Sequence, residues 1–231
     1  MIWIKKYIVF GLVAILIVVS GRLIVLWGLH GTPWGKASFK HSVDNYISKH
    51  YPTMVKDSCE ISYSFKEGQY SATMKSENII FHIKESNEGM IYDNYLAKKI
   101  GNQLSFEVEK VVTDIFGVTS KINVSISSQF NSLVHTDQNI SYSDLNDEYK
   151  SDSNIFVHLQ ESLEDKADIL AKCYALLKWI KDNKNEANVI FTFLNNYELR
   201  IDFDTLSELN SSNELENLIR KSEPIVDSNF R

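Results

Sequence analysis

Cysteine and proline are scarce in this sequence, and basic residues are fewer than acidic ones. Its 231 residues include only 2 cysteines, too few for a scaffold built from disulfides, and only 3 prolines. Apolar residues make up 44% and charged residues 23%, so the composition excludes a disordered or collagen-like chain. The 24 Lys and Arg residues face 30 Asp and Glu residues, for a net charge of −6, which argues against nucleic acid as a partner.

Motifs that carry catalytic chemistry are missing as well. No serine lies in a GxSxG or SxxK motif, no glycine cluster resembles a phosphate-binding loop, and the 6 histidines form no HExxH or HxH motif. We therefore expect no enzymatic activity, no catalytic residue, no metal site and no cofactor. A hydrolase whose site is assembled from residues dispersed along the chain is the alternative that the sequence leaves open.

Two groups of side chains have a second interpretation. Cys59 and Cys173 fall on the apolar faces of predicted elements, which indicates buried, inert thiols, and a disulfide between them is the alternative. A group of acids between residues 137 and 152 indicates a solvated loop, with calcium binding as the alternative, because the acids lack the regular spacing and central glycine of an EF-hand. These acids are Asp137, Asp144, Asp147, Glu148 and Asp152.

One long apolar run dominates the N-terminal part of the sequence. Tyr7–Leu29 comprises 23 residues with a single charge, and a helix of that length is roughly 34 Å long, enough to cross a hydrocarbon core of about 30 Å. Lys5 and Lys6 precede the run, so the positive-inside rule predicts a cytoplasmic N-terminus and an extracytoplasmic location for residues 30–231. We therefore predict a single-pass protein of the cell membrane, with the lipid bilayer as its partner through residues 7–29.

Aromatic and basic residues flank this run in the pattern that membrane interfaces favour. Arg22 is the single charge inside it, and its side chain can reach the outer headgroups because Leu29 follows only seven residues later. A signal peptide cleaved near Ser20 is the rival interpretation, but the sequence lacks an Ala-x-Ala site there, and cleavage would leave an exposed apolar end. The predicted membrane-interface residues are Trp3, Lys5, Lys6, Arg22, Trp27 and Trp34.

The rest of the sequence predicts an α+β fold of two small units, each with helices and an antiparallel sheet. All 30 acids follow residue 29, so this part of the chain is strongly acidic. A short Gly/Pro linker over 30–35 leads into the first unit, 36–116, in which we expect a helix, a three-strand meander and a long helix over 92–116. Each strand of the meander has one apolar face, and the first helix is expected to cover it.

The second unit is expected over 117–223, with a polar tail over 224–231. Strands are predicted over 122–126 and 155–159, and a hairpin over 189–203 is predicted to turn at Asn195-Asn196. A capping box from Ser162 to Asp165 predicts the start of an amphipathic helix that runs through Ile180. We also expect a helical turn within 142–149 and a short helix around 215–219.

The N-terminal part of the chain resembles a known family. HGTPWGK at His30–Lys36 directly follows the membrane helix, Tyr51-Pro52 follows the next helix, and YSFKEGQY at Tyr63–Tyr70 lies in a hairpin. These features resemble the YfjL-like proteins of Bacillus-type bacteria, which are membrane-anchored and functionally uncharacterised, and the likeness covers residues 1–90 best. It implies an anchored, two-part protein of a Gram-positive envelope and supplies no catalytic residue. The helix and meander are also similar to PepSY-type domains, which implies binding or peptidase regulation.

The sequence as a whole favours a non-catalytic binding module that lies outside the membrane and acts on another envelope protein or peptide. Besides the hydrolase, a passive structural or stress-related surface protein is a further interpretation. An exposed apolar groove or an unpaired sheet edge would favour peptide binding. A concave pocket with convergent groups of shifted pKa would favour an enzyme.

Overall fold

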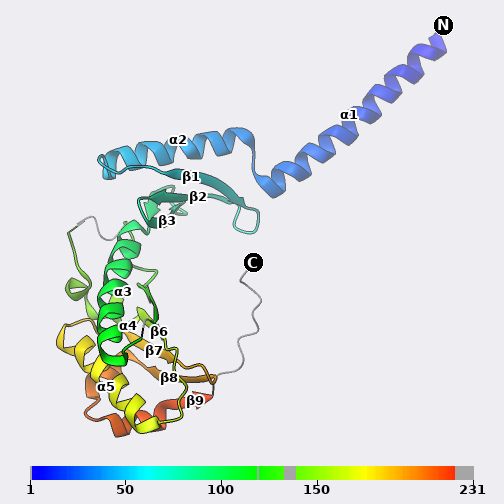
Figure 1. Cartoon of the computed structure of the whole chain (residues 1–231). Helices are drawn as coiled ribbons and strands as arrows, with labels where there is room; N and C mark the ends of the chain where they lie inside the picture. The colour runs from blue at the N-terminus through cyan, green and yellow to red at the C-terminus, as the bar shows by residue number, and fades with distance from the viewer. Residues whose placement is uncertain (1, 119, 133–138, 222–231) are drawn as a thin grey trace. The chain divides into compact units, whose positions relative to one another are not determined.

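The computed structural model of the chain describes residues 2–118, 120–132 and 139–221, with side chains from residue 15 onward (Figure 1). The contacts divide the chain into two compact units, Met1–Asp93 and Asn94–Arg231. We call them unit 1 and unit 2 and describe each by itself. Helices alternate with two separate sheets, which confirms the predicted α+β class.

Unit 1 begins with the apolar helix α1 (Ile2–His30). Within the described part of the chain it is the one helix that is long and apolar enough to cross a membrane. Its large apolar side chains from Ile15 to Leu26 are exposed, apart from the half-buried Trp27 that follows them. A helix with an apolar surface on all sides needs an apolar environment or a partner, because water is unfavourable for it.

The remainder of unit 1 is a helix on a four-stranded antiparallel sheet. Helix α2 (Pro33–His50) contacts β1 (Ser58–Ser64), β2 (Gln69–Ser76) and β4 (Ile91–Asp93), and the sheet order is β1-β2-β3-β4 with β3 at Ile79–Glu85. The predicted helix and meander are therefore confirmed, and β4 is an addition. The helix and the sheet meet through residues at the predicted spacings, namely Phe39, Val43, Ile47, Ile61, Ala72, Met74, Phe81 and Ile83, all of which are buried.

The boundary between the units lies earlier than the sequence indicates. Helix α3 (Tyr95–Phe116) was expected in the first unit, but its buried face belongs to the hydrophobic core of unit 2. Gly101, which weakens the helix prediction, allows α3 to lie very close to the sheet of unit 2, because a Cβ at this position would be 3.0 Å from the carbonyl oxygen of Val124. An amphipathic pattern shows that one face is buried but not against which sheet.

Unit 2 contains a five-stranded sheet in the order β5-β6-β7-β8-β9. Neighbours pair antiparallel except β6 and β7, which are parallel because helix α5 crosses over between them. The strand pattern predicted four of the five strands, and the parallel pair departs from the purely antiparallel sheet that we expected. The bounds are β5 Lys121–Ser125, β6 Asn154–His158, α5 Lys166–Asp182, β7 Asn188–Thr192, β8 Tyr197–Ile201 and β9 Ile219–Lys221.

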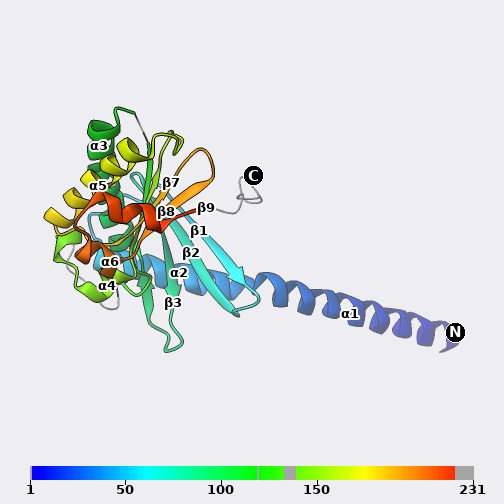
Figure 2. The same cartoon turned by 90° about the horizontal axis from the view of Figure 1, so that it is seen from below.

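Helices α3 and α5 contact each other and lie on the same face of this sheet (Figures 1 and 2). The strand residues beneath them are apolar and alternate with those of the opposite face, so the core of unit 2 forms on one side only. The remaining elements are η1 (Tyr142–Asp144), α4 (Asp147–Ser151), α6 (Phe203–Glu208) and η2 (Ser212–Leu218). The predicted helical turn within 142–149 and the short helix near 215 are thus present.

Two predicted element ends in unit 2 are wrong. Asp165, not Ser162, is the N-cap of α5, and its carboxylate accepts a hydrogen bond from the backbone N–H of Asp168. Phe203 begins α6 instead of ending the hairpin. The hairpin turn itself is confirmed, with Asn196 at φ = 58°, a conformation that asparagine tolerates better than most residues.

Candidate functional site

The connection between α1 and α2 is an ordered joint. Only Gly31 and Thr32 lie between the two helices, so the predicted linker over 30–35 is shorter than expected. The Thr32 side chain caps α2 by accepting a hydrogen bond from the backbone N–H of Gly35 at 3.1 Å. Gly31 has φ = +72°, in the left-handed region that favours glycine, and a Cβ on Gly31 would clash with Tyr70 of β2.

Aromatic side chains hold the joint from two directions. The rings of Trp27 at the end of α1 and Trp34 at the start of α2 are 5.0 Å apart in an edge-to-face contact. The Tyr70 hydroxyl donates a hydrogen bond to the carbonyl oxygen of Thr32 at 2.9 Å, and its ring lies 4.9 Å from that of Tyr63. The end of the apolar helix is therefore connected to the folded part of unit 1 by side-chain contacts as well as by the backbone.

The structure brings together only two of the predicted membrane-interface residues. Trp27 and Trp34 form the pair just described, while Arg22 is exposed on α1 more than one turn before them. The other three fall on residues whose side chains lie outside the described part of the chain: Trp3, Lys5 and Lys6. Phe65 continues the apolar alternation of Ile61 and Tyr63 in the sequence, which predicts a position on the apolar face of the strand. In the structure it is 58% exposed, in the turn that follows β1.

A second candidate surface lies on the sheet of unit 2, on the face opposite α3 and α5. None of its residues belongs to the hydrophobic core of the unit, although Ile190 is buried and Phe156 half-buried. We call this surface the open face. The strand register arranges it in three rows: Lys121, His158, Thr192, Glu198 and Arg220; Asn123, Phe156, Ile190 and Arg200; Ser125, Asn154 and Asn188.

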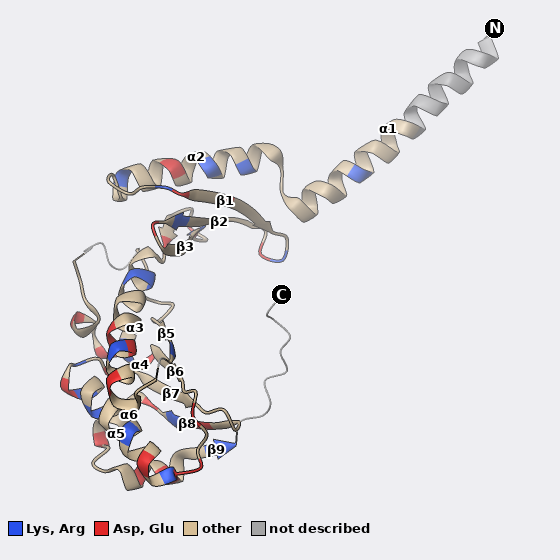
Figure 3. Cartoon of the chain, viewed as in Figure 1, with Lys and Arg blue, Asp and Glu red and all other residues tan. Residues whose placement is uncertain are grey.

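Positive charge predominates on the open face. Lys121, Arg200 and Arg220 lie on it with one acid, Glu198, whereas unit 2 as a whole has 14 Lys and Arg residues against 22 Asp and Glu residues. Figure 3 shows Lys and Arg on β5, β8 and β9. Arg200 is exposed, and neither Arg200 nor Arg220 forms an ion pair with any described residue. The Arg220 side chain is exposed as well.

His158 lies between Lys121 and Thr192 in the first row of the open face. Its Nδ1 is 2.8 Å from the hydroxyl oxygen of Thr192. Partial burial lowers the pKa of His158 below its ordinary value of 6.5, and the nearby charge of Lys121 lowers it further. The imidazole is therefore neutral at pH 7, so it adds a hydrogen-bonding group but no charge to the face.

Titration of His158 gives the first test of this arrangement. We expect a pKa below 6.5 by NMR, and an increase toward 6.5 in Lys121→Gln because that variant removes the neighbouring positive charge. The folded state favours the neutral imidazole. The contribution of His158 to folding stability is therefore fully present above pH 6.5 and is lost as pH falls through the pKa of His158 in the folded state. Lys166→Gln on α5, away from the open face, is the control and should leave the titration unchanged. A pKa above 6.5 would contradict the described environment.

Two clefts in unit 2 are too small to be obvious ligand sites, and a tyrosine hydroxyl in each is already hydrogen-bonded within the protein. Their volumes are about 200 Å³ between α5 and α6 and about 160 Å³ between α3 and η1, below the ~300 Å³ at which ligand pockets usually begin. In the first, the hydroxyl of Tyr174 donates to the carbonyl oxygen of Asn210 at 2.7 Å. In the second, Tyr142 donates to the carbonyl oxygen of Glu186 at 3.0 Å, and burial raises the pKa of Tyr142. These hydroxyls hold loops in place.

The acids and cysteines considered in the sequence analysis do not form a site in the described part of the chain. In the described residues, no group of three or more His, Cys, Asp or Glu side chains could hold a metal ion. Asp144 accepts hydrogen bonds from Ser141, and Asp137 lies outside the described residues. Cys59 and Cys173 are free thiols, half-buried and buried respectively, and burial raises the pKa of both. A raised pKa reduces the thiolate fraction and hence the reactivity.

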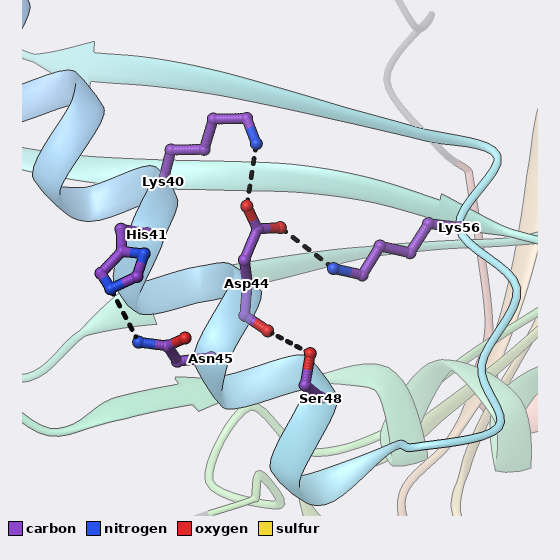
Figure 4. Close-up of polar contacts among 6 residues, drawn as sticks. All are labelled: Lys40, His41, Asp44, Asn45, Ser48 and Lys56. Atoms are coloured by element: carbon purple, nitrogen blue, oxygen red, sulfur yellow. Dashed lines mark hydrogen bonds and ion pairs between the residues drawn. The ribbon is translucent and has the colours of Figure 1, made fainter.

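A cluster of polar side chains on the solvent side of α2 is structural in character (Figure 4). Asp44 forms ion pairs with Lys40 at 2.8 Å and with Lys56 at 3.0 Å, and the latter connects α2 to the segment before β1. The two lysines lower the pKa of the Asp44 carboxyl through hydrogen bonds. Because the ion pairs are solvent-exposed, each contributes only about 0–1 kcal/mol to stability. The cluster offers no unpaired group that points to a ligand.

Comparisons with known proteins add no relative. No protein-family model, no curated protein and no solved structure matches the chain. The resemblance to the YfjL-like proteins therefore stays a prediction.

Proposed function

We propose that this protein is a membrane-anchored, non-catalytic binding module of the cell envelope, and that the open face of unit 2 binds an acidic, extended peptide segment of another envelope protein. The observation that supports this most is the placement of Arg200 and Arg220 around an apolar strip on a sheet face that lies outside the core of an otherwise acidic unit. Charge of the opposite sign in the partner would guide its approach and fix its position.

The apolar strip favours a peptide over a polyanion without side chains. Phe156 and Ile190 are register partners on adjacent strands, which are about 5 Å apart, and Arg200 is the next residue in the same row. Because Ile190 is only 3% exposed, a partner with one aromatic or aliphatic side chain could place it on the half-buried Phe156 while a neighbouring carboxylate reaches Arg200. The Asn123 and Asn154 side chains beside the strip supply donors and acceptors for a peptide backbone.

Anchoring is supported by the apolar surface of α1 and by the joint. Cleavage near Ser20 would leave the last turns of α1, including Trp27, attached to the folded part of unit 1 with their apolar side chains exposed. We propose that α1 is retained, with the N-terminus cytoplasmic and residues 30–231 outside. Protease added to intact protoplasts should degrade residues 40–231, and mass spectrometry of the membrane fraction should recover α1. Protection of residues 40–231 or an N-terminus trimmed near Ser20 would contradict this topology.

Peptide binding is tested on the full chain in detergent micelles. The probe is a fluorescent peptide with one phenylalanine among aspartates and glutamates, and the comparison peptide carries lysine in place of every acid. We expect anisotropy to show binding of the acidic peptide alone, and Arg200→Gln with Arg220→Gln to weaken it at least tenfold, or ~1.4 kcal/mol. The matched control is Lys166→Gln with Lys178→Gln, which removes two exposed charges from α5 and should leave binding unchanged.

Three outcomes would contradict the peptide proposal. Equal binding of the acidic and the basic peptide would show that the open face does not select by charge. An equal loss in the control variant would show that net charge alone matters. Competition by polyphosphate with no dependence on the phenylalanine, tested with an alanine-containing peptide, would assign the face to a polyanion instead.

A further inference from the structure

We propose that the turn between β1 and β2 rests on the lipid headgroup region beside α1, so that unit 1 touches the membrane at a second point through Phe65. This inference rests on the proposed anchoring by α1. Phe65 is 58% exposed, and the boundary between headgroups and acyl chains readily accommodates an exposed aromatic side chain.

The strand register places this turn next to the end of α1. Tyr63 and Tyr70 are register partners, and the Tyr70 hydroxyl is bonded to the carbonyl oxygen of Thr32, one residue beyond Gly31. One more pair, Ser64 and Gln69, completes the hairpin before the turn. At about 3.3 Å per residue, Phe65 is thus only ~7 Å along the strand from the tyrosine pair that touches the joint. Helix α1 also contacts β1 directly.

The contacts at the joint keep this arrangement ordered. Tyr70 stacks on Phe39 of α2 with ring centres 6.0 Å apart, and Phe39 is buried. The same tyrosine packs against Gly31 and Gly35, where any Cβ would meet its ring. The β1–β2 hairpin, the start of α2 and the end of α1 therefore form one packed cluster, and the turn has a defined place next to the helix end.

The residues around the turn have the chemistry of a membrane interface. Trp34 is 62% exposed at the start of α2, on the Trp27 side of the joint. Lys66 is exposed beside Phe65, where its ammonium group can reach lipid phosphates, and Lys36 lies in the first turn of α2. Glu67 is the acid of the turn and reduces its net charge, so the contact depends more on Phe65 than on attraction to anionic lipid.

The test measures the depth of the turn in a bilayer. The full chain carrying Cys59→Ser and Phe65→Cys is labelled with an environment-sensitive fluorophore and reconstituted into phosphatidylcholine vesicles, with or without bromine on the acyl chains. Lys66→Cys gives a second position in the same turn. The matched control is Val55→Cys, which is also strongly exposed, at 64%, but lies in the segment after the far end of α2. We expect bromolipid to quench the labels at 65 and 66 and to leave the label at 55 bright.

Each outcome decides between the proposals. Sedimentation of the chain with the vesicles reports whether α1 anchors it, independently of the label. A chain that sediments but is not quenched at positions 65 and 66 would overturn the second contact and leave the anchor intact. A chain that stays in the supernatant would overturn both. Equal quenching at position 55 would show that the whole of unit 1 lies in the interface and that the turn has no special role.

Discussion

Replacing Phe191 by alanine will lower the free energy of unfolding of unit 2 by about 3–5 kcal/mol, because a fully buried phenylalanine is removed and a cavity remains. Phe191 lies on β7, the central strand of the sheet, and its side chain belongs to the hydrophobic core of unit 2. Hydrogen exchange measured peptide by peptide checks this, because it reports the opening free energy of each unit separately. Exchange in α3, α5 and β7 should accelerate together.

The matched control for this variant is Phe81→Ala in unit 1, where Phe81 is equally inaccessible to solvent. We expect its effect to be confined to α2 and β1–β4, since the two side chains belong to different units. Phe156→Ala removes a half-buried phenylalanine from the open face of the same sheet, and the loss of stability should be clearly smaller. A loss as large as that of Phe191→Ala would show that the open face is covered.

Replacement of the buried polar residue Asp93 should strongly destabilise unit 1. This residue is 1% exposed, and its carboxylate accepts hydrogen bonds from Tyr46 at 2.6 Å and from Tyr51 at 3.0 Å. Replacement by alanine removes the acceptor of two phenol hydroxyls between α2 and β4. At about 1.5–3 kcal/mol for each of the two hydrogen bonds to the charged group, we expect a loss of about 3–6 kcal/mol in unit 1, measured by urea denaturation of the full chain.

Asp93→Asn is the conservative comparison. An amide oxygen can still accept from one or both hydroxyls, but the bonds are no longer charge-assisted, so the loss should be intermediate. Burial raises the pKa of Tyr51, and the adjacent Asp93 charge raises it further, so this hydroxyl stays protonated and remains a donor at neutral pH. Equal stability of Asp93→Ala and the unchanged protein would show that the tyrosines do not depend on this carboxylate.

The elements that the sequence predicted well are those whose periodicity is set by a single buried face. Phe39, Val43 and Ile47 of α2, and the alternating residues of β2 and β3, are buried as expected. Such patterns reflect local geometry and the hydrophobic effect, and both can be inferred from one segment at a time. The hairpin turn at Asn195-Asn196 was predictable for a similar reason, because asparagine tolerates the positive φ angle that tight hairpin turns need.

What the sequence missed depends on contacts between distant segments. The stripe on α3 does not tell which sheet it covers, and the close approach at Gly101 is visible only once Val124 is in place. Strand β4 is short, and the sequence pattern assigned two of its three residues to the helix predicted over 92–116. The parallel pairing of β6 and β7 follows from the crossover through α5. It could not be predicted because the sequence does not show that these two strands are neighbours in the sheet.

The candidate surfaces were accessible from the sequence only in part. Trp27 and Trp34 were identified from their positions around an apolar run, and the structure adds that they touch each other. Phe65 fitted the alternation of β1, but the strand ends one residue earlier, which leaves the ring exposed. The open face was hidden because Lys121, His158 and Arg220 come from distant parts of the chain and become neighbours only through strand order.

If α1 spans a bilayer as proposed, its two-residue connection to α2 has a mechanical consequence. A flexible tether would let such a helix rotate about its own axis without turning the domain that it carries. Here Gly31 is confined by Tyr70, and Trp27 is in contact with Trp34, so a turn of α1 about its axis is resisted by the β-hairpin. A neighbouring membrane helix that fixed the rotation of α1 about its axis would then also fix the direction in which unit 1 faces.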